Sequence, residues 1–179
     1  LHGVFLSHAD LDHFNAVPFL LPRFYPQQVM VSERMHQQLF AHQQNRAGLA
    51  TRHLADCLKD EQISVEILSA GEQWTLGSVS LEVLAPVRNH EYSSDNDASL
   101  VLLLNHAESE VLLPGDIEQE GIELLTFNHP RRSHDVVMVP HHGSLHSEPR
   151  IFSHWSWPRF AVVSTGHEPI SSVVSERYQ

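Results

Sequence analysis

Cysteine is almost absent from this chain of 179 residues, in which Cys57 is the only one. A single cysteine excludes an internal disulfide framework and zinc sites built mainly from cysteine. No apolar run approaches the roughly 20 residues that a membrane-spanning helix needs, so we expect the given segment to be soluble. Basic residues are also scarce, because 11 Lys and Arg stand against 22 Asp and Glu, for a net charge of −11. This charge disfavours a broad electrostatic surface for duplex nucleic acid.

Histidine, by contrast, is abundant, with 15 residues in the chain. Most of them stand alone, and we interpret those as structural. The exception is the segment 7–13, with the sequence SHADLDH, which follows an apolar run and holds four side chains that can bind metal. At the end of an extended strand, alternate residues point to the same side, so His8, Asp10 and Asp12 can converge there. A tight turn then brings His13 beside Asp12.

Three later apolar runs also end in polar clusters. Residues 111–113 lead into Pro-Gly-Asp, residues 136–139 into Pro-His-His-Gly, and residues 160–163 into Ser-Thr-Gly-His. Buried strands that end in His and Asp are typical of α/β proteins that place their chemistry at one edge of a sheet. With the strand before the segment 7–13, four strands pointing the same way would make one site. Imidazole and carboxylate groups are the usual ligands of zinc, manganese or iron at a hydrolytic centre.

The remaining pattern predicts a mixed α/β fold without repeats or linkers, so we expect a single domain over residues 1–179. Ser32 is a good N-cap for a helix that continues through Leu39. Alternating apolar residues at 63–67 and 79–83 predict a meander of short antiparallel strands, and a long polar loop follows. Further strands and helices are expected at 4–6, 14–21, 29–31, 54–58, 98–104, 110–113, 117–127, 136–139 and 160–163.

These motifs resemble those of the metallo-β-lactamase superfamily of two-metal hydrolases. The signature of that superfamily is His-x-His-x-Asp-His, then a distal His, a Gly-Asp and a last His. His8, Asp12 and His13 match the first motif, and Asp10 stands where the second His usually occurs. An aspartate at that position adds an oxygen ligand, which favours harder ions such as manganese as well as zinc.

Two later motifs extend the resemblance. Asp116, in Leu-Pro-Gly-Asp, matches the aspartate that bridges the two metals. His142 is the best match for the final ligand, with His141 as the rival. The resemblance implies an αββα sandwich of the metallo-β-lactamase type. Because the first motif starts so near Leu1, the usual N-terminal strands of that sandwich are missing, and we expect a partial domain.

One branch of the superfamily shares the departures from its signature. Four motifs of this chain resemble the soluble domain of ComEC-type competence proteins, which are membrane proteins of bacterial DNA uptake. The motifs are Ser-His-x-Asp-x-Asp-His, Asn-x-x-Ser-Leu-Val-Leu, Leu-Pro-Gly-Asp-Ile-Glu and Val-Pro-His-His-Gly-Ser. The pair Asn15-Ala16 departs from the usual Gly-Gly. The resemblance implies a phosphodiesterase or nuclease that acts on single-stranded DNA. Its partner would be the membrane channel portion of the same or an associated polypeptide, and no soluble protein partner is indicated.

The resemblance also implies two divalent metal ions, zinc or manganese. The residues that would hold one ion are His8, Asp10 and Asp116. Those that would hold the other are Asp12, His13, Asp116 and His142. A hydroxide bridging the two ions would attack phosphorus. The catalytic carboxylates would be Asp10, Asp12 and Asp116, and Asp10 could manage protons if it is not a tight metal ligand.

Polar residues near the motifs are candidates for contacts with the substrate. They are Asn96, Ser144, His146 and His167. Arg131 and Arg132 look like a phosphate-binding pair, but they precede the strand whose other end bears His142, so we interpret them as solvated surface. Trp155 and Trp157 are interpreted as packing around the following proline rather than as stacking on bases.

Two other functions stay open at this point. A small-molecule hydrolase, such as a phosphocholine esterase or a lactonase, would use the same metals. A catalytically degenerate domain would bind DNA or a membrane partner without turnover. Metal content, and cleavage of single-stranded DNA compared with a small phosphodiester, separate these possibilities.

Overall fold

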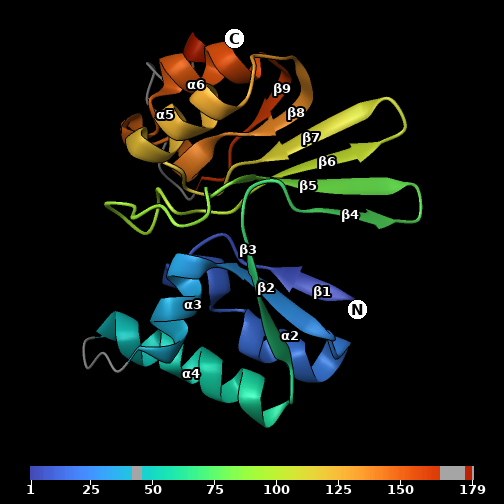
Figure 1. The fold of residues 1–179 in the computed structure, drawn as a ribbon, viewed down its shortest axis with the longest axis vertical. Helices are drawn as coiled ribbons and strands as arrows, with labels where there is room; N and C mark the ends of the chain where they lie inside the picture. Colours follow the sequence, from blue (N-terminus) through green and yellow to red (C-terminus); the bar gives the residue numbers. More distant parts are fainter. Residues whose placement is uncertain (42–45, 166–175, 179) are drawn as a thin grey trace. The chain divides into compact units, whose positions relative to one another are not determined.

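The computed structural model describes residues 1–41, 46–165 and 176–178, which form two compact units, Leu1–Leu68 and Ser69–Gln179. Below they are called unit 1 and unit 2. Each unit consists of a β-sheet with helices packed on it (Figure 1). The predicted α/β class is therefore confirmed. Among the described residues, no helix is both long enough and apolar enough to cross a bilayer.

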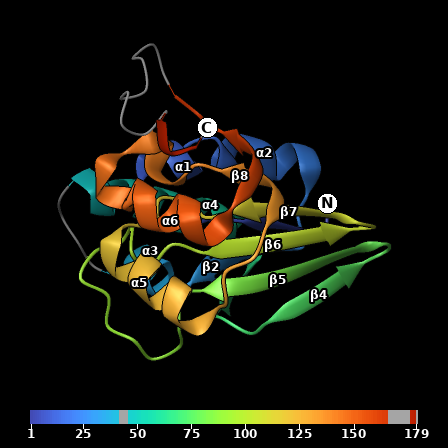
Figure 2. The same cartoon turned by 90° about the horizontal axis from the view of Figure 1, so that it is seen from above.

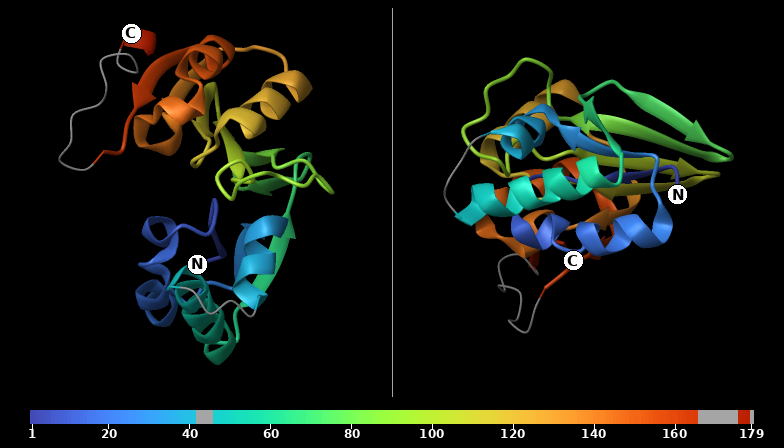
Figure 3. Two further views of the ribbon diagram at one scale, coloured as in Figure 1. Left: turned by 90° about the vertical axis from the view of Figure 1, so that its left-hand side faces the viewer. Right: turned by 90° about the horizontal axis from the view of Figure 1, so that it is seen from below.

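Unit 1 is built around a small parallel sheet. Its elements in chain order are β1 (Gly3–Phe5), α1 (Leu11–Phe14), α2 (Val17–Phe24), β2 (Gln28–Ser32), α3 (Glu33–Phe40), α4 (Arg46–Asp60) and β3 (Ser64–Leu68). The strands pair in the order β1-β2-β3, with Val4 opposite Val29 and Val29 opposite Val65. The helices α2 and α4 lie side by side (Figure 3). Apolar side chains from the strands and helices form one core, which includes Leu21 and Leu54.

The start of α3 shows how the sequence fixes a helix boundary in unit 1. The Ser32 side chain accepts a hydrogen bond from the backbone N–H of Met35 at 3.2 Å, which satisfies an amide that the helix itself cannot pair. Met35 and Leu39, one helical turn apart, are both buried. The predicted cap and helix are therefore confirmed.

Unit 2 contains a six-stranded mixed sheet. Its strands are β4 (Gln73–Leu76), β5 (Val79–Ala85), β6 (Val101–His106), β7 (Ser109–Leu113), β8 (His134–Met138) and β9 (Pro158–Val162). Its helices are α5 (Gln119–Asn128), η1 (Pro140–Gly143), η2 (Leu145–Ser147) and α6 (Pro149–Ser156). The strands pair in sequence order, antiparallel from β4 to β7 and parallel from β7 to β9.

The core of unit 2 lies between its sheet and the helices α5 and α6, which lie next to each other (Figure 2). Ile122 and Leu125 of α5 and Phe152 of α6 pack with the strand residues Leu103 and Leu112. All five side chains are buried. Val137 of β8 belongs to the same core, so this packing holds β7 and β8 in place, and the loops that follow these two strands carry the Gly-Asp and His-His-Gly motifs.

The loop between β5 and β6 is attached to α5 through a buried carboxylate. Asp97 accepts a hydrogen bond from the backbone N–H of Gly121 at 3.0 Å and another from the Ser94 hydroxyl at 2.6 Å. An α-helix leaves its first amides without intrahelical partners, so a carboxylate from the loop satisfies one of them. The long polar loop expected from the sequence is thus an ordered part of unit 2.

Two expectations about strand pairing are wrong. Residues 63–67 and 79–83 were expected in one antiparallel meander, but β3 pairs parallel with β2 in unit 1, whereas β5 pairs with β4. β4 was not expected, because its side chains are mostly exposed and give no apolar alternation.

The four strands that end in polar clusters do not share one sheet either. β7, β8 and β9 are parallel neighbours, but β1 lies in the other sheet, because an apolar run does not encode its partner.

Candidate metal centre

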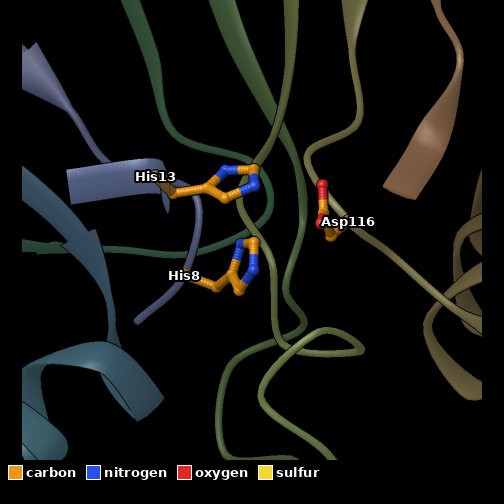
Figure 4. A group of neighbouring side chains, drawn as sticks. All are labelled: His8, His13 and Asp116. Atoms are coloured by element: carbon orange, nitrogen blue, oxygen red, sulfur yellow. The ribbon is translucent and has the colours of Figure 1, made fainter. Parts of the chain in front are cut away.

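Ser7, His8 and His13 form a compact group in unit 1, on the segment that joins β1 to α1. The Ser7 hydroxyl lies 3.0 Å from Nδ1 of His8 and 3.0 Å from Nδ1 of His13. The centroids of the two imidazole rings are 4.2 Å apart, and Figure 4 shows the rings side by side. A hydroxyl oxygen has two lone pairs and can accept a hydrogen bond from the Nδ1–H of both rings. In that arrangement the serine holds both rings by Nδ1, and the Nε2 lone pair of each ring is left for a ligand.

Each of these histidines also has an aspartate close to its Nε2 atom. An Asp10 carboxylate oxygen lies 3.6 Å from Nε2 of His8, and an Asp12 oxygen lies 3.7 Å from Nε2 of His13. Asp10 occupies the N-cap position of α1, but its side chain makes no capping hydrogen bond, so its carboxylate is turned to His8 instead. Both carboxylates are more than half exposed. Unit 1 therefore offers mixed nitrogen and oxygen donors, as the spacing of the motif predicts.

In unit 2, the buried Asp116 follows β7 and faces two histidines that follow β8. Its carboxylate oxygen lies 3.6 Å from Nε2 of His142 and 3.9 Å from Nε2 of His141. Asp116 is the third side chain drawn in Figure 4. The backbone N–H of His141 donates to the Gly115 carbonyl at 3.2 Å, which ties the loop after β8 to the loop after β7. The Gly-Asp and His-His-Gly motifs thus meet at one edge of the sheet, as expected.

The partners of the two adjacent histidines differ. Nδ1 of His142 lies 2.8 Å from the Ser164 carbonyl, which can only accept, so this nitrogen carries the proton and Nε2 of the neutral ring carries the lone pair. Nδ1 of His141 lies 2.8 Å from a Glu118 carboxylate oxygen. A metal-binding histidine typically donates its other ring N–H to a carbonyl or carboxylate. His142 meets this condition through its hydrogen bond to Ser164, whereas His141 lies close to Glu118 without hydrogen-bond geometry, and His142 is also the nearer of the two to Asp116.

The backbone of this histidine pair is strained. His141 has φ 47° and ψ 49°, His142 has φ 53° and ψ 19°, and Gly143 follows with φ 85°. The left-handed conformation costs a non-glycine residue about 1–2 kcal/mol. Such strain persists where surrounding contacts hold it and is concentrated at functional sites. The conformation presents both imidazole rings to Asp116.

The remaining predicted site residues lie in several places. Asn96 donates to a Glu118 oxygen at 3.4 Å, and the Ser144 hydroxyl accepts from the backbone N–H of His146. His146 is exposed and lines a cavity of about 410 Å³ whose other walls include several carboxylates. His167 lies outside the described residues. The substrate contacts assigned to these residues stay predictions.

Two residues of these clusters were missed from the sequence. Ser7 holds both imidazoles of unit 1, and Glu118 contacts His141. A hydroxyl directly before the first histidine was the available signal for Ser7. Glu118 follows Asp116 by two residues, just before α5, and Asp116 lies in a turn, so no strand periodicity in the sequence marks Glu118 as a neighbour of the site.

Comparison with known proteins gives relatives but no family assignment, since no family model matches the chain. ComE operon protein 3 of Bacillus subtilis is 25% identical over 179 residues, which covers 97% of this chain and 22% of that protein. Recombination protein 2 of Haemophilus influenzae is 25% identical over 93% of this chain and 18% of its own length. Competence protein ComA of Neisseria gonorrhoeae is 30% identical over 55% of this chain and 14% of its own length. The chain thus spans about a fifth or less of these relatives.

A solved structure shows which fold the chain has. The metallo-β-lactamase fold protein YhfI of Bacillus subtilis matches with a TM-score of 0.51, covering 99% of this chain and 70% of that protein. The sequence identity between the two is 10%, so this likeness concerns the fold alone.

Proposed function

Because this chain has the metallo-β-lactamase fold and resembles competence proteins along almost its whole length, we propose that it is a metal-dependent phosphodiesterase that cleaves single-stranded DNA during DNA uptake. In this proposal residues 1–179 are one partial domain, attached to or associated with a membrane channel. The substrate follows from the competence-protein relatives and the chemistry from the two clusters of histidines and aspartates.

One observation carries the chemical part of the proposal. Two segments far apart in the sequence each place an imidazole Nε2 atom 3.6 Å from an aspartate oxygen, His8 with Asp10 and His142 with Asp116. In both segments a neighbouring oxygen holds the Nδ1 atom of the same ring. This repeated arrangement is what a metal-binding histidine needs, whereas an incidental polar surface has no reason to repeat it.

The donor set fits two divalent ions, zinc or manganese. The residues proposed to hold them are His8, Asp10, Asp12, His13, Asp116 and His142. When bound, two such ions supply Lewis acidity to the phosphodiester and lower the pKa of water. Ser7 would orient His8 and His13, and the Ser164 carbonyl would hold the proton at Nδ1 of His142. If Asp10 is not a tight ligand, its exposed carboxylate would instead accept a proton at Oδ2 during the reaction.

The proposal is tested by metal analysis and by cleavage of single-stranded DNA with manganese or zinc. We expect two ions per chain and metal-dependent cleavage. Asp116→Asn keeps the shape of the side chain but removes its charge, so it should lower both the bound metal and the cleavage rate, the latter about a hundredfold or more. Glu108→Gln, the same chemical change at an exposed turn between β6 and β7, is the matched control and should change neither.

Other outcomes would favour the alternatives. Hydrolysis of bis(nitrophenyl) phosphate without cleavage of DNA would point to a small-molecule phosphodiesterase and overturn the nuclease proposal. A chain that binds no metal at saturating supply would be a degenerate binding domain. Unchanged turnover in Asp116→Asn would remove Asp116 from the centre.

A further inference from the structure

A second concave site lies in unit 2, away from Asp116 and His142. It is a cavity of about 470 Å³, which we call the arginine cavity, and its walls include Arg131, Arg150, Arg177, His154, Trp157 and Glu176. Cavities of this size are typical of sites for small ligands or for single units of a polymer. Three guanidinium groups and an indole ring at one cavity are notable in a chain whose net charge is −11.

The arginine cavity lies at the edge of the sheet opposite to the candidate metal centre. Arg131 precedes the start of β8, and Trp157 directly precedes β9. Asp116 and His142 instead follow the carboxyl ends of β7 and β8, which run parallel to β9. A five-residue strand is about 15 Å long, so the strands separate the two sites by at least that order of distance. The cavity is therefore not part of the metal centre.

The three arginines of the cavity are available to bind an anion. Within the described part of unit 2, the arginines that form ion pairs are Arg88, Arg132 and Arg159. None of the three arginines of the cavity lies within ion-pair distance of a carboxylate among these described residues.

Arg131 is also held in place. Its Nε donates to the His154 carbonyl at 2.7 Å, and its Cζ lies 4.4 Å from the centre of the Trp157 ring. A guanidinium held in this way presents its remaining donors to a phosphate with little further loss of conformational freedom.

Trp157 provides an aromatic surface at the same place. It ends α6 in a left-handed conformation, with φ 33°, and its side chain is 58% exposed. Trp155, two residues earlier, is buried and donates its indole N–H to the His129 carbonyl at 2.9 Å. The expected packing role thus fits Trp155 but is wrong for Trp157. The expectation that Arg131 is only solvated surface is also incomplete, since it stacks on that ring.

We propose that the arginine cavity binds single-stranded nucleic acid, with a base against Trp157 and backbone phosphates at Arg131, Arg150 and Arg177. An exposed aromatic ring in one cavity with cationic side chains is the arrangement by which proteins hold single strands without reading their sequence. The site would anchor a strand away from the metal centre. Only the choice of DNA over RNA rests on the proposed function. A concave pocket of this volume suits a nucleotide better than the flat surface of an anionic membrane.

The test measures binding in excess EDTA, so that it does not depend on metal or on turnover. Fluorescence anisotropy of a labelled oligothymidylate is followed as a function of salt for the 179-residue chain and its variants. Trp157→Ala should weaken binding about tenfold with the salt dependence nearly unchanged, because it removes an aromatic surface and no charge. Arg150→Gln should lower the slope of log K against log salt by about 0.7, the value for one lost phosphate contact on a single strand.

Arg88→Gln is the matched control, because it removes the same charge from an arginine of unit 2 outside the cavity, and it should leave the slope unchanged. Circular dichroism checks the fold of each variant, and the exposed Arg150 has no described contact whose loss would unfold the chain. Absence of oligothymidylate binding, or wild-type binding in both cavity variants, would overturn the proposal. If the cavity variants lose binding to phosphatidylglycerol vesicles but bind oligothymidylate as the wild type does, the cavity is a membrane-binding surface and the proposal is wrong. EDTA removes the metal, so this binding experiment does not depend on cleavage. A chain that proves not to be a nuclease could therefore still confirm or contradict binding at the arginine cavity.

Discussion

At the scale of single residues, the backbone conformation decides which partner each of the two adjacent histidines after β8 contacts. His141 and His142 are adjacent and both left-handed, yet one Nδ1 faces Glu118 and the other faces the Ser164 carbonyl. The Ser164 carbonyl forces a single tautomer on His142, with the lone pair at the Nε2 atom that faces Asp116. Nε2 of His141 lies farther from Asp116, at 3.9 Å against 3.6 Å, so His142 is the better candidate for the ligand.

The first prediction separates these two histidines. His142→Ala should weaken the binding of manganese or zinc by more than the roughly 10–100-fold that loss of a ligand's hydrogen-bond partner costs. His141→Ala should weaken it by less than about tenfold, because Asp116 and His142 stay in place. Isothermal titration of each variant with metal measures the difference. Equal losses in the two variants, or the larger loss in His141→Ala, would assign the ligand to His141.

A second prediction concerns the pKa of Glu120 on α5. Hydrogen bonds from the Ser93 hydroxyl, from His90 and from the Ser93 backbone N–H lower the pKa of this carboxyl from 4.5 to about 2. Because folding lowers the pKa, the ionised carboxylate stabilises the folded chain above pH 4.5. That contribution is lost as the pH falls from 4.5 towards 2.

Glu120→Gln cannot ionise and should lack this part of the pH dependence. The difference in unfolding free energy between wild type and variant should be largest above pH 4.5 and shrink as the pH approaches 2. Urea unfolding at several pH values measures it, with Glu108→Gln as the control for removal of an exposed carboxylate. A difference that stays constant with pH would mean that the pKa of Glu120 is not lowered by folding.

At the scale of elements, the contact between α5 and the loop after β5 depends on a glycine. Gly121 is buried in α5, and its backbone N–H donates to Asp97. A Cβ atom at this position would lie 2.6 Å from the Asp97 carbonyl oxygen and 2.5 Å from Cγ1 of Ile117. The loop can approach the helix this closely only because residue 121 has no side chain.

Gly121→Ala should therefore destabilise the chain, by about 1–3 kcal/mol, as overpacking does. Helix propensity alone predicts the opposite, a gain of about 1 kcal/mol. Urea unfolding decides between the two effects. Glu123→Ala, on the exposed side of the same helix, should change stability by about 0.5 kcal/mol or less. A Gly121→Ala chain as stable as wild type would show that the loop yields to the added methyl group.

The sequence predicts the elements better than it predicts their partners. Local chemistry identifies the Ser32 cap, and apolar runs identify every strand of the two sheets except β4. Pairing depends on contacts between distant segments, which explains why β3 was assigned to the wrong sheet and the exposed β4 was missed. At the candidate site, dense motifs bring forward side chains such as Asp116 and His142, which stay proposed ligands. The groups that orient them could not be predicted, since a backbone carbonyl such as that of Ser164 has no signature in the sequence.

At the scale of the whole molecule, the proposed metal ligands come from the first 13 residues and from residues 116–142. Metal that binds only the folded chain must stabilise it against unfolding. Manganese or zinc at a free concentration about 100 times Kd should add about 2.7 kcal/mol to the unfolding free energy. Thermal unfolding with metal and then with EDTA measures this gain and its reversal.

Asp116→Asn provides the control for this last prediction. It should unfold at nearly the same temperature with and without metal, because the shared ligand is weakened, whereas Glu108→Gln should respond as the wild type does. A wild-type chain whose stability does not change with saturating metal would contradict binding to the folded state.

The position of β9 has a consequence for the behaviour of many copies together. It is the outermost strand at one side of the described sheet, and its Phe160 and Val162 side chains are 58% and 45% exposed. An apolar open edge can recruit a strand from another molecule and so begin aggregation. Pro158 has no amide hydrogen to offer such a strand, and the charged Arg159 lies between it and Phe160, with its Cζ 5.4 Å from the phenyl ring. We therefore expect these two residues to oppose strand pairing between copies, and their replacement to lower solubility at high concentration.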